Sequence, residues 1–328
     1  MTTPTIDPLT MSRLALIRLL YLQGVDQSRL PAPLVYSSVL TFHDAAELFL
    51  GLAADQLGAN LSDHLAFMKY WDELSPKKLG ARGVDLAGRG GMDRLNRLHN
   101  GFKHADTLPG LPAVEQARAE VTSFLEDNTT MVFAIDFVDI DMADVVPDQA
   151  IRDELKAAAA ENRTGDRIEA MALLVEALRH VFDPRTRTPF LVNPSTIGRD
   201  YLFGPMPEYE LGKIFTGIGQ HRILSQGDLV QQISEMMRTT SALQDGMRVL
   251  ALGIDFPKYH RFRTITPGVS MTYDGRRHIG HAPTYAPRSE DFDWCYRFVI
   301  IAALRAAEVQ TDLEDIPDES KAAGTRQY

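Results

Sequence analysis

The hydrophobic positions along this chain recur mostly with the period of an α-helix. Apolar residues stand at i, i+3, i+4 and i+7 over long stretches, and this spacing places them on one face of a helix. The pattern therefore predicts an all-α fold. The expected helices cover Thr10–Gln23, Pro33–Gly58, Ser62–Leu74, Arg89–Ala105, Ala113–Asp139, Pro147–Glu161, Asp166–Phe182, Gly227–Gly253 and Glu290–Val309.

The order of these segments predicts three parts. Residues 1–145 are expected to form a helical bundle, and residues 146–310 a second, mainly helical domain. This second domain should begin with a helical hairpin whose turn lies at residues 162–166, and continue as an irregular, proline-rich part with two further helices. The glycine-rich stretch 79–91 is expected to be a flexible loop, and the acidic residues 311–328 a disordered tail.

Two stretches of the second domain differ from the rest in composition. Residues 183–227 are rich in proline and aromatic residues and are expected to be a connector over the surface. Residues 255–287 interleave basic with aromatic side chains, which suits a loop that holds single-stranded RNA through phosphates and stacking. The same composition is typical of an ordered loop packed on helices, so the sequence leaves both interpretations open.

The stretch MDRLNRLHNGFKHADTLP at positions 92–109 contains residues that suit phosphate binding and proton transfer. Within its expected helix Arg97, Asn100 and His104 are spaced i, i+3 and i+7, so they share a face. His99 lies at the border of that face, and a core stripe on the other side consists of Leu95, Leu98 and Phe102. Such a helix could bind a phosphate and move a proton, but a solvated basic face next to a turn would show the same spacing.

This stretch resembles the signature of HEPN domains, in which an arginine is usually followed by a polar residue and then, a few positions on, by a histidine (R-x4-6-H). Arg94 with His99 and Arg97 with His104 are two possible registers. The third aligns Asn100 with the polar position of the family, so that His104 takes the histidine position and His99 stands where the arginine is expected. We prefer this third register, in which Arg97, one turn earlier, or a charged His99 would be the phosphate-binding cation.

The resemblance covers roughly residues 31–128. It includes the stretch Ser38–Gly58, which is similar to the other long helix of a HEPN domain and has His43, Asp44 and Glu47 at its polar start. The phrase LNRLHNGFKHADTLP is also similar to a group of uncharacterised bacterial proteins. The resemblance implies a HEPN-like helical bundle within the all-α fold.

The resemblance further implies metal-independent RNA cleavage, as in toxins, abortive-infection systems and other antiviral or stress-response proteins, with a site formed across a homodimer. Histidine suits proton transfer from a 2′-hydroxyl, and the planar fork of arginine suits phosphate oxygens. His104 would then be the acid/base, Arg97 the phosphate clamp and Asn100 the positioning group, with His99 beside them. Further RNA contacts are expected from Lys103, Arg94, Lys77 and Lys78. No cofactor and no metal is expected.

Two other functions fit the same sequence. A HEPN-like interaction or sensor subunit that has lost catalysis would explain His99 in place of the expected arginine, and it would have a tight protein partner. A sensor of a small molecule or nucleotide could use a cavity between the helical domain and the proline-rich part. The first of these predicts no RNA turnover, and the second predicts stabilisation by a ligand.

The net charge of the chain and its distribution limit the classes of partner that the protein can bind. A net charge of −10 over 328 residues argues against a protein that coats nucleic acid in general, and no DNA specificity is indicated. Residues 77–104 carry seven basic side chains against two acids, whereas residues 126–154 carry nine acids and one arginine. A local positive site on an acidic body is compatible with selective RNA binding or with a partner surface, and packing of the two segments together would cancel both charges.

Two further features concern location. The chain has one cysteine, Cys295, which excludes an intramolecular disulfide and is expected to be a small buried hydrophobe. The apolar run near the N-terminus is broken by Arg13 and Arg18, and no stretch reaches the roughly 18 apolar residues that span a bilayer. We therefore expect a soluble, cytoplasmic protein without membrane association.

Overall fold

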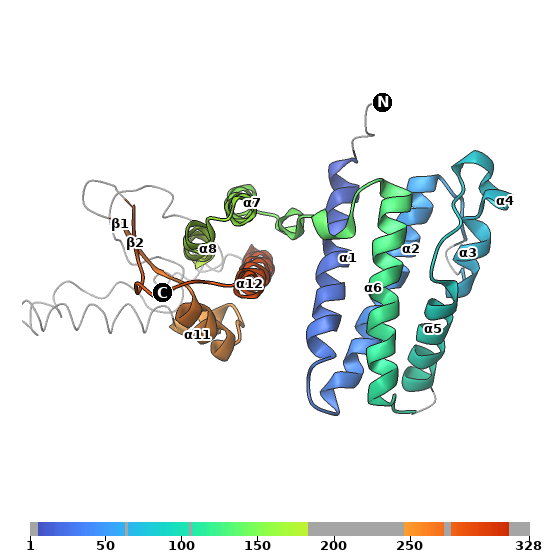
Figure 1. Cartoon of the computed structure of the whole chain (residues 1–328), viewed down its shortest axis with the longest axis horizontal. Helices are drawn as coiled ribbons and strands as arrows, with labels where there is room; N and C mark the ends of the chain where they lie inside the picture. The colour runs from blue at the N-terminus through green and yellow to red at the C-terminus, as the bar shows by residue number, and fades with distance from the viewer. Residues whose placement is uncertain (1–5, 63–64, 105–106, 183–245, 272–276, 315–328) are drawn as a thin grey trace, which may run out of the picture. The chain divides into compact units, whose positions relative to one another are not determined.

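The computed structural model describes residues 6–62, 65–104, 107–182, 246–271 and 277–314 (Figure 1). These residues are mostly helical, with a single two-stranded sheet among them, which confirms the predicted all-α class. The contacts divide the chain into two compact units, 1–145 and 146–328. Within the described residues, no helix has a stretch long and apolar enough to cross a lipid bilayer.

Unit 1 is a bundle of long helices that lie side by side (Figure 1). Helix α2 packs against three others, and α5 and α6 also pack against each other. The core between them is formed by aromatic and aliphatic side chains that are fully buried, among them Phe42, Phe49 and Phe124. The long helices are α1 (Pro8–Gln27), α2 (Ser37–Leu57), α5 (Arg89–His104) and α6 (Leu111–Phe133). The shorter elements are α3 (Tyr70–Glu73), α4 (Pro76–Leu79) and the 3₁₀ helices Leu34–Tyr36, Phe67–Lys69, Gly80–Arg82, Phe137–Asp139 and Met142–Val145.

Local chemistry sets where the first two helices begin and how closely they approach. The Asp7 carboxylate caps α1 by accepting hydrogen bonds from the backbone N–H groups of Leu9 and Thr10, at 3.0 and 3.1 Å. Gly24 of α1 lies against the ring of Phe42 in α2, and a Cβ at this glycine would come within 2.7 Å of that ring. The absence of a side chain therefore allows α1 to lie close to α2.

A buried amide on α6 fixes the segment that precedes α5. Asn128 is 0% exposed, and its Oδ1 accepts a hydrogen bond from the backbone N–H of Ala87 at 2.9 Å. Its Nδ2 donates to the Phe124 carbonyl at 2.7 Å, and the Trp71 indole N–H donates to the Ala87 carbonyl at 3.3 Å. Because buried backbone groups need partners, these bonds anchor the chain two residues before α5 begins.

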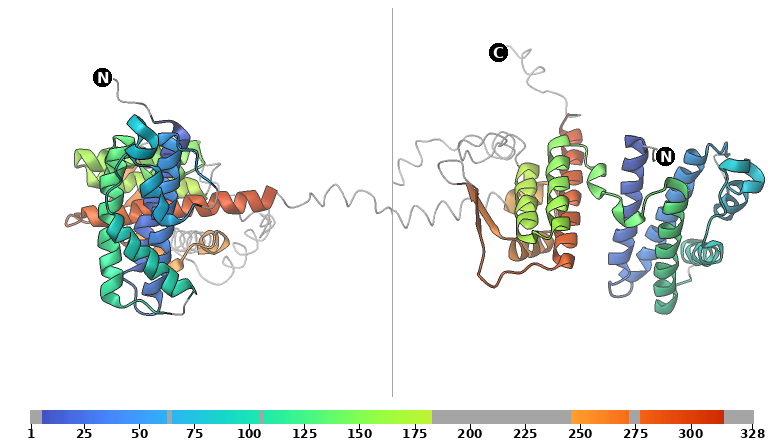
Figure 2. Two further views of the ribbon diagram at one scale, coloured as in Figure 1. Left: turned by 90° about the vertical axis from the view of Figure 1, so that its right-hand side faces the viewer. Right: turned by 45° about the horizontal axis from the view of Figure 1, so that its top comes forward.

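Unit 2 contains the predicted helical hairpin, formed by α7 (Gln149–Thr164) and α8 (Arg167–Phe182), with Gly165 between them at φ 96°. Helix α12 (Ser289–Glu314) packs along α8 and also contacts α7 (Figure 2). Cys295 on α12 is fully buried, as the sequence predicts, and burial raises the pKa of its thiol.

Several predicted elements are wrong in their extent. The helix expected over Ser62–Leu74 is reduced to the 3₁₀ helix Phe67–Lys69 and the short α3, because Ala66 has an extended backbone and the residue before Pro76 is extended as well. The helix expected to reach Asp139 ends at Phe133, where the next residue, Ala134, adopts a left-handed φ of 58°. Residues 79–91, expected as a loop, include a 3₁₀ turn and the start of α5.

The described residues of the irregular part of unit 2 also form a helix and two strands that were not predicted. Residues 255–287 contain α11 (Phe256–Ile265), which is capped by the Asp255 side chain through a 3.0 Å hydrogen bond from the Lys258 backbone N–H. They also contain the antiparallel strands β1 (Gly268–Met271) and β2 (Arg277–Gly280). Residues 311–314, expected as part of the disordered tail, belong to α12, which continues to Glu314. The predicted connector 183–227, most of the helix expected over 227–253 and residues 315–328 lie outside the described residues.

Candidate functional site

Helix α5 carries the side chains in which the sequence predicts chemistry. Arg97, Asn100 and His104 are all exposed, and Lys103 next to His104 is exposed as well. The helix is held on its opposite side by α2 and α6. The three residues of the predicted polar face are therefore accessible to a ligand along the outer side of α5.

His99 is placed differently from the sequence prediction. It is only 7% exposed and continues the buried stripe of Met92 and Leu95 at i, i+3 and i+7, whereas Leu98 and Phe102 are half-buried. The core stripe of α5 is thus rotated by about one residue relative to the predicted one, because α5 turns this face toward α2. His99 belongs to the interior and not to the border of the polar face.

The partner of His99 is a second buried histidine. The ring of His43, on α2, stacks on the His99 ring with a centroid distance of 3.9 Å and an interplanar angle of 10°. On its other side His43 stacks on Phe67, at 4.4 Å and 29°. The sequence placed His43 at a polar helix start, but it is only 5% exposed. Both faces of its imidazole are covered, so only the ring edge can meet a ligand.

The edge of the His43 ring has two different neighbours. Its Nε2 lies 3.3 Å from Oδ1 of Asn96 on α5, at hydrogen-bonding distance. Its Nδ1 lies 3.7 Å from Oε2 of Glu47, one turn further along α2, and has no hydrogen-bond partner. The Nδ1 atom of His99 is buried without a hydrogen-bond partner as well. Buried polar atoms are usually paired, so unpaired ones in a stacked pair call for an explanation.

Burial controls the charge of His43. The pKa of His43 is lowered from 6.5 to about 4, mainly by desolvation and then by the neighbouring His99, while the hydrogen bond with Asn96 and the charge of Asp44 act in the opposite direction. Lys103, at the end of α5, also disfavours the charged form. His43 is therefore neutral at pH 7, and its imidazole offers a lone pair and not a positive charge.

The arginines of α5 are engaged with carboxylates. Arg97 forms an ion pair with Asp93, one turn earlier in the same helix. The Arg94 Nε donates to Oε1 of Glu120 on α6 at 2.9 Å. An exposed ion pair within one helix is worth only about 0.3–0.5 kcal/mol, and the Arg97 side chain is 75% exposed. A phosphate could therefore displace Asp93 from Arg97 at little cost.

Two of the predicted RNA contacts lie elsewhere. Lys77 and Lys78 are exposed on α4, and Lys78 Nζ lies 3.5 Å from Oε1 of Glu73. Figure 1 shows α4 at one end of unit 1 and the C-terminal end of α5 at the other. The structure thus places Arg97, Asn100, Lys103 and His104 together along α5, and it does not bring Lys77 and Lys78 to them.

Sequence reasoning missed the stacked pair of histidines. The signal that could have drawn attention to His43 is its spacing from Glu47, since i and i+4 lie on the same side of a helix. No spacing could have paired His43 with His99, because the two lie on different helices. Comparisons of the chain with protein-family models, with curated proteins and with solved structures found no match.

Proposed function

We propose that this protein is an endoribonuclease with a HEPN-like helical domain, unit 1, and that RNA binds along the C-terminal half of α5. The observation that carries the proposal is the exposed row of Arg97, Asn100 and His104 on one face of this helix. The row combines a cation for phosphate oxygens, an amide that can donate or accept, and a histidine for proton transfer. It supports cleavage without a metal ion, in a defence or stress response.

The reaction can be written with these three side chains. His104 takes the proton of a ribose 2′-hydroxyl, the 2′-oxygen attacks the adjacent phosphorus, and the bond from phosphorus to the 5′-oxygen breaks. Arg97, after leaving Asp93, balances the negative charge that develops on the phosphate oxygens. The products are a 2′,3′-cyclic phosphate and a 5′-hydroxyl, whose proton comes from the imidazolium of a second histidine. In the HEPN-like arrangement a second copy of the chain supplies this histidine.

The distances along the helix favour such a paired site. Arg97 and His104 are seven positions apart, which corresponds to about 10 Å along the helix axis. One phosphate group cannot contact both helical positions unless the long arginine side chain folds along the helix toward the histidine. Two copies of α5 placed side by side in a homodimer would bring the arginine of one copy near the histidine of the other. Asn100, between the two positions, would orient the RNA.

The buried position of His99 changes the role that the sequence suggested for it. A side chain stacked on His43 in the interior supports the position of α5 and does not contact RNA. Lys103 is exposed next to His104 and suits a phosphate on the flanking nucleotide. Arg94 remains exposed although it is paired with Glu120, so it provides a second, weaker contact.

The test is RNA cleavage by the full chain in the presence of a chelator. Structured and single-stranded RNAs are incubated with the wild type, with His104→Ala and with His260→Ala, which removes an exposed histidine from helix α11 of unit 2. We expect wild type and His260→Ala to leave 2′,3′-cyclic phosphate ends, and His104→Ala to be slower by about 100-fold or more. Equal cleavage by all three proteins would refute the assignment of His104.

A second function is favoured by a specific observation. The position at which the family has its arginine holds His99, which is buried, while Arg94 and Arg97 are already paired with carboxylates. This arrangement suits a HEPN-like interaction or sensor subunit without catalysis. Such a subunit would give no cleavage product with any of the three proteins and would bind a protein partner. Replacing His99 by arginine cannot distinguish the two functions, because it would bury a charge and destabilise the bundle.

A further inference from the structure

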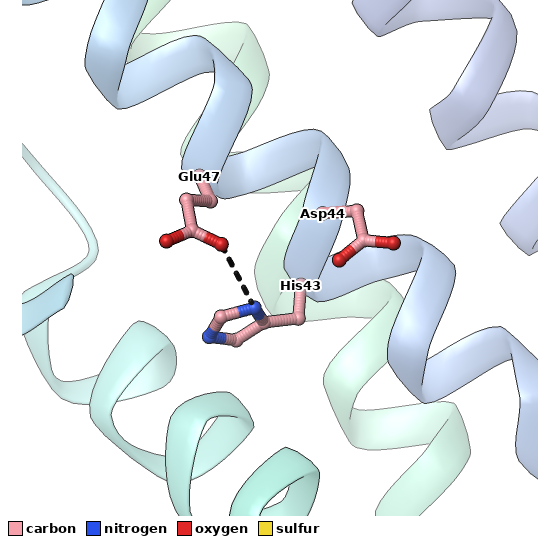
Figure 3. Close-up of side chains that lie close together, drawn as sticks. All are labelled: His43, Asp44 and Glu47. Atoms are coloured by element: carbon pink, nitrogen blue, oxygen red, sulfur yellow. Dashed lines mark ion pairs between the residues drawn. The ribbon is translucent and has the colours of Figure 1, made fainter.

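Helix α2 carries a group of potential metal ligands that the proposed RNA chemistry does not use. His43, Asp44 and Glu47 leave a single turn of this helix (Figure 3). One ligand atom from each lies within 4.8 Å of the others. Acidic side chains often gather on a surface without a ligand, but this group also contains a buried imidazole whose Nδ1 has no hydrogen-bond partner.

The hydrogen bonds on α5 decide which nitrogen of His43 carries the proton. Asn96 Oδ1 accepts a hydrogen bond from Asn100 Nδ2 at 3.4 Å, and it lies 3.3 Å from His43 Nε2. An amide oxygen can only accept, so His43 Nε2 must donate and therefore carries the proton. In a neutral imidazole the other nitrogen is then unprotonated. His43 Nδ1 consequently presents a lone pair toward Glu47.

Two atoms with lone pairs, one on His43 and one on Glu47, thus face each other at the side of α2. Nδ1 of His43 and Oε2 of Glu47 are 3.7 Å apart (Figure 3), and neither has a proton to share. A proton on Nδ1 would resolve the contact, but it would leave a charged ring that is 5% exposed and covered on both faces by His99 and Phe67. A cation that binds both atoms would satisfy them without placing a charge on the imidazole ring.

We propose that His43 Nδ1, Glu47 and Asp44 bind one divalent transition-metal ion, for which Zn²⁺ is the probe. Zinc lies about 2.0–2.2 Å from nitrogen and carboxylate ligands in a tetrahedral arrangement, so two of its ligand atoms are about 3.4 Å apart. The contact between His43 and Glu47, at 3.7 Å, is close to this spacing. Asp44 and Glu47 are exposed, so their carboxylates are free to rotate and close the remaining distances, which are within 4.8 Å.

The chemistry of the ligands selects the class of metal. An imidazole nitrogen with two carboxylates suits zinc and neighbouring transition metals, whereas Mg²⁺ and Ca²⁺ prefer oxygen ligands alone. Two carboxylates and a neutral imidazole also balance the charge of a divalent ion, although Lys103 nearby opposes a cation. Asn96 holds the other ring nitrogen, and a hydrogen bond at that nitrogen generally orients a histidine that binds a metal.

The stacking excludes His99 from the same metal. A metal ion lies close to the plane of an imidazole that binds it, and the planes of His43 and His99 are parallel within 10° at a centroid distance of 3.9 Å. One ion cannot lie in both planes. The site therefore has three protein ligands from α2 and completes its coordination with water, because the two carboxylates are exposed. A bound ion would also fix the His43 ring, on which His99 of α5 stacks.

Calorimetric titration of the full chain with Zn²⁺ tests the proposal. The variant Glu47→Gln removes an exposed ligand without changing the buried stack, and Glu154→Gln is the matched control, because Glu154 forms a similar pair with His180 in unit 2, at 2.5 Å. We expect Glu47→Gln to weaken the tightest zinc binding by about tenfold or more, and Glu154→Gln and excess Mg²⁺ to leave it unchanged. No zinc binding by the wild type, or an equal affinity of the wild type and Glu47→Gln, would overturn the proposal.

Nitrogen-15 NMR of the histidine rings gives a second readout that does not depend on affinity. In chelator at pH 7, His43 should have its proton on Nε2, and added Zn²⁺ should shift its Nδ1 signal. A proton on Nδ1, donated to Glu47, would overturn the proposal even if zinc binds elsewhere. Since the cleavage assay contains chelator, failure of the metal site and failure of the ribonuclease proposal are separate results.

Discussion

Lowering the pH should reduce the unfolding free energy of unit 1, because His43 gains a proton more readily in the unfolded chain. The test compares the wild type with His43→Phe, which keeps an aromatic ring in the stack but cannot titrate. The pKa of His43 is lowered from 6.5 to about 4 in the folded chain, chiefly by burial and then by His99. Lys103 adds to this effect, and Asp44 opposes it. The unfolded chain therefore binds a proton more readily than the folded chain as the pH falls from 7.

The magnitude follows from the two pKa values. At about 1.36 kcal/mol per pKa unit, a fall from 6.5 to about 4 corresponds to at most about 3.4 kcal/mol of unfolding free energy. The contribution of His43 is fully present above pH 6.5, is lost as the pH falls toward 4, and levels off below that value. Between pH 7 and pH 5 the wild type should lose about 2 kcal/mol more than His43→Phe.

Urea unfolding at pH 7, 6 and 5 in the presence of chelator measures this difference. The chain has two tryptophans, one in each unit, so both proteins should carry Trp294→Phe, which leaves the buried Trp71 as the fluorescent reporter of unit 1. The other titrating groups are shared and cancel in the comparison. A wild type whose stability changes with pH no more than that of His43→Phe would refute the reasoning, because His43 would then bind protons equally in both states.

Two further substitutions test what holds each unit together. Asn128→Ala should lower the unfolding free energy of unit 1 by about 2–4 kcal/mol, because it leaves the Ala87 N–H without its partner and opens a cavity. Replacement of the exposed Asn100 by alanine should change this free energy by less than about 0.5 kcal/mol. Equal effects of the two substitutions in urea unfolding would contradict this account. Arg277→Met should weaken the hairpin β1–β2 by about 1 kcal/mol, because Arg277 pairs with Glu169 and Glu176 on α8. Hydrogen exchange of the β2 amide groups should become faster and lose its salt dependence, and an unchanged rate would show that these ion pairs do not hold the hairpin.

The elements that the sequence predicts best are those with an unbroken apolar period. Helix α2 and the hairpin of α7 and α8 follow their patterns closely, since an amphipathic helix must bury its apolar face wherever it packs. The errors lie where local backbone conformation overrides the pattern, as at Ala66 and Ala134. The helix α11 was missed because its apolar period is short, although Asp255 and Pro257 form a recognisable helix start.

The sequence by itself determines the all-α class, the exposed face of α5 with Arg97, Asn100 and His104, and the burial of Cys295, because these follow from periodicity within one element. Only the tertiary structure decides that His99 lies inside the bundle. The rotation of a helix about its axis depends on which neighbours it meets, and a shift of one residue is enough to move a side chain from its surface to its core. The stack of His43 on His99 and the lone pair that His43 directs toward Glu47 arise only because α2 and α5 pack together.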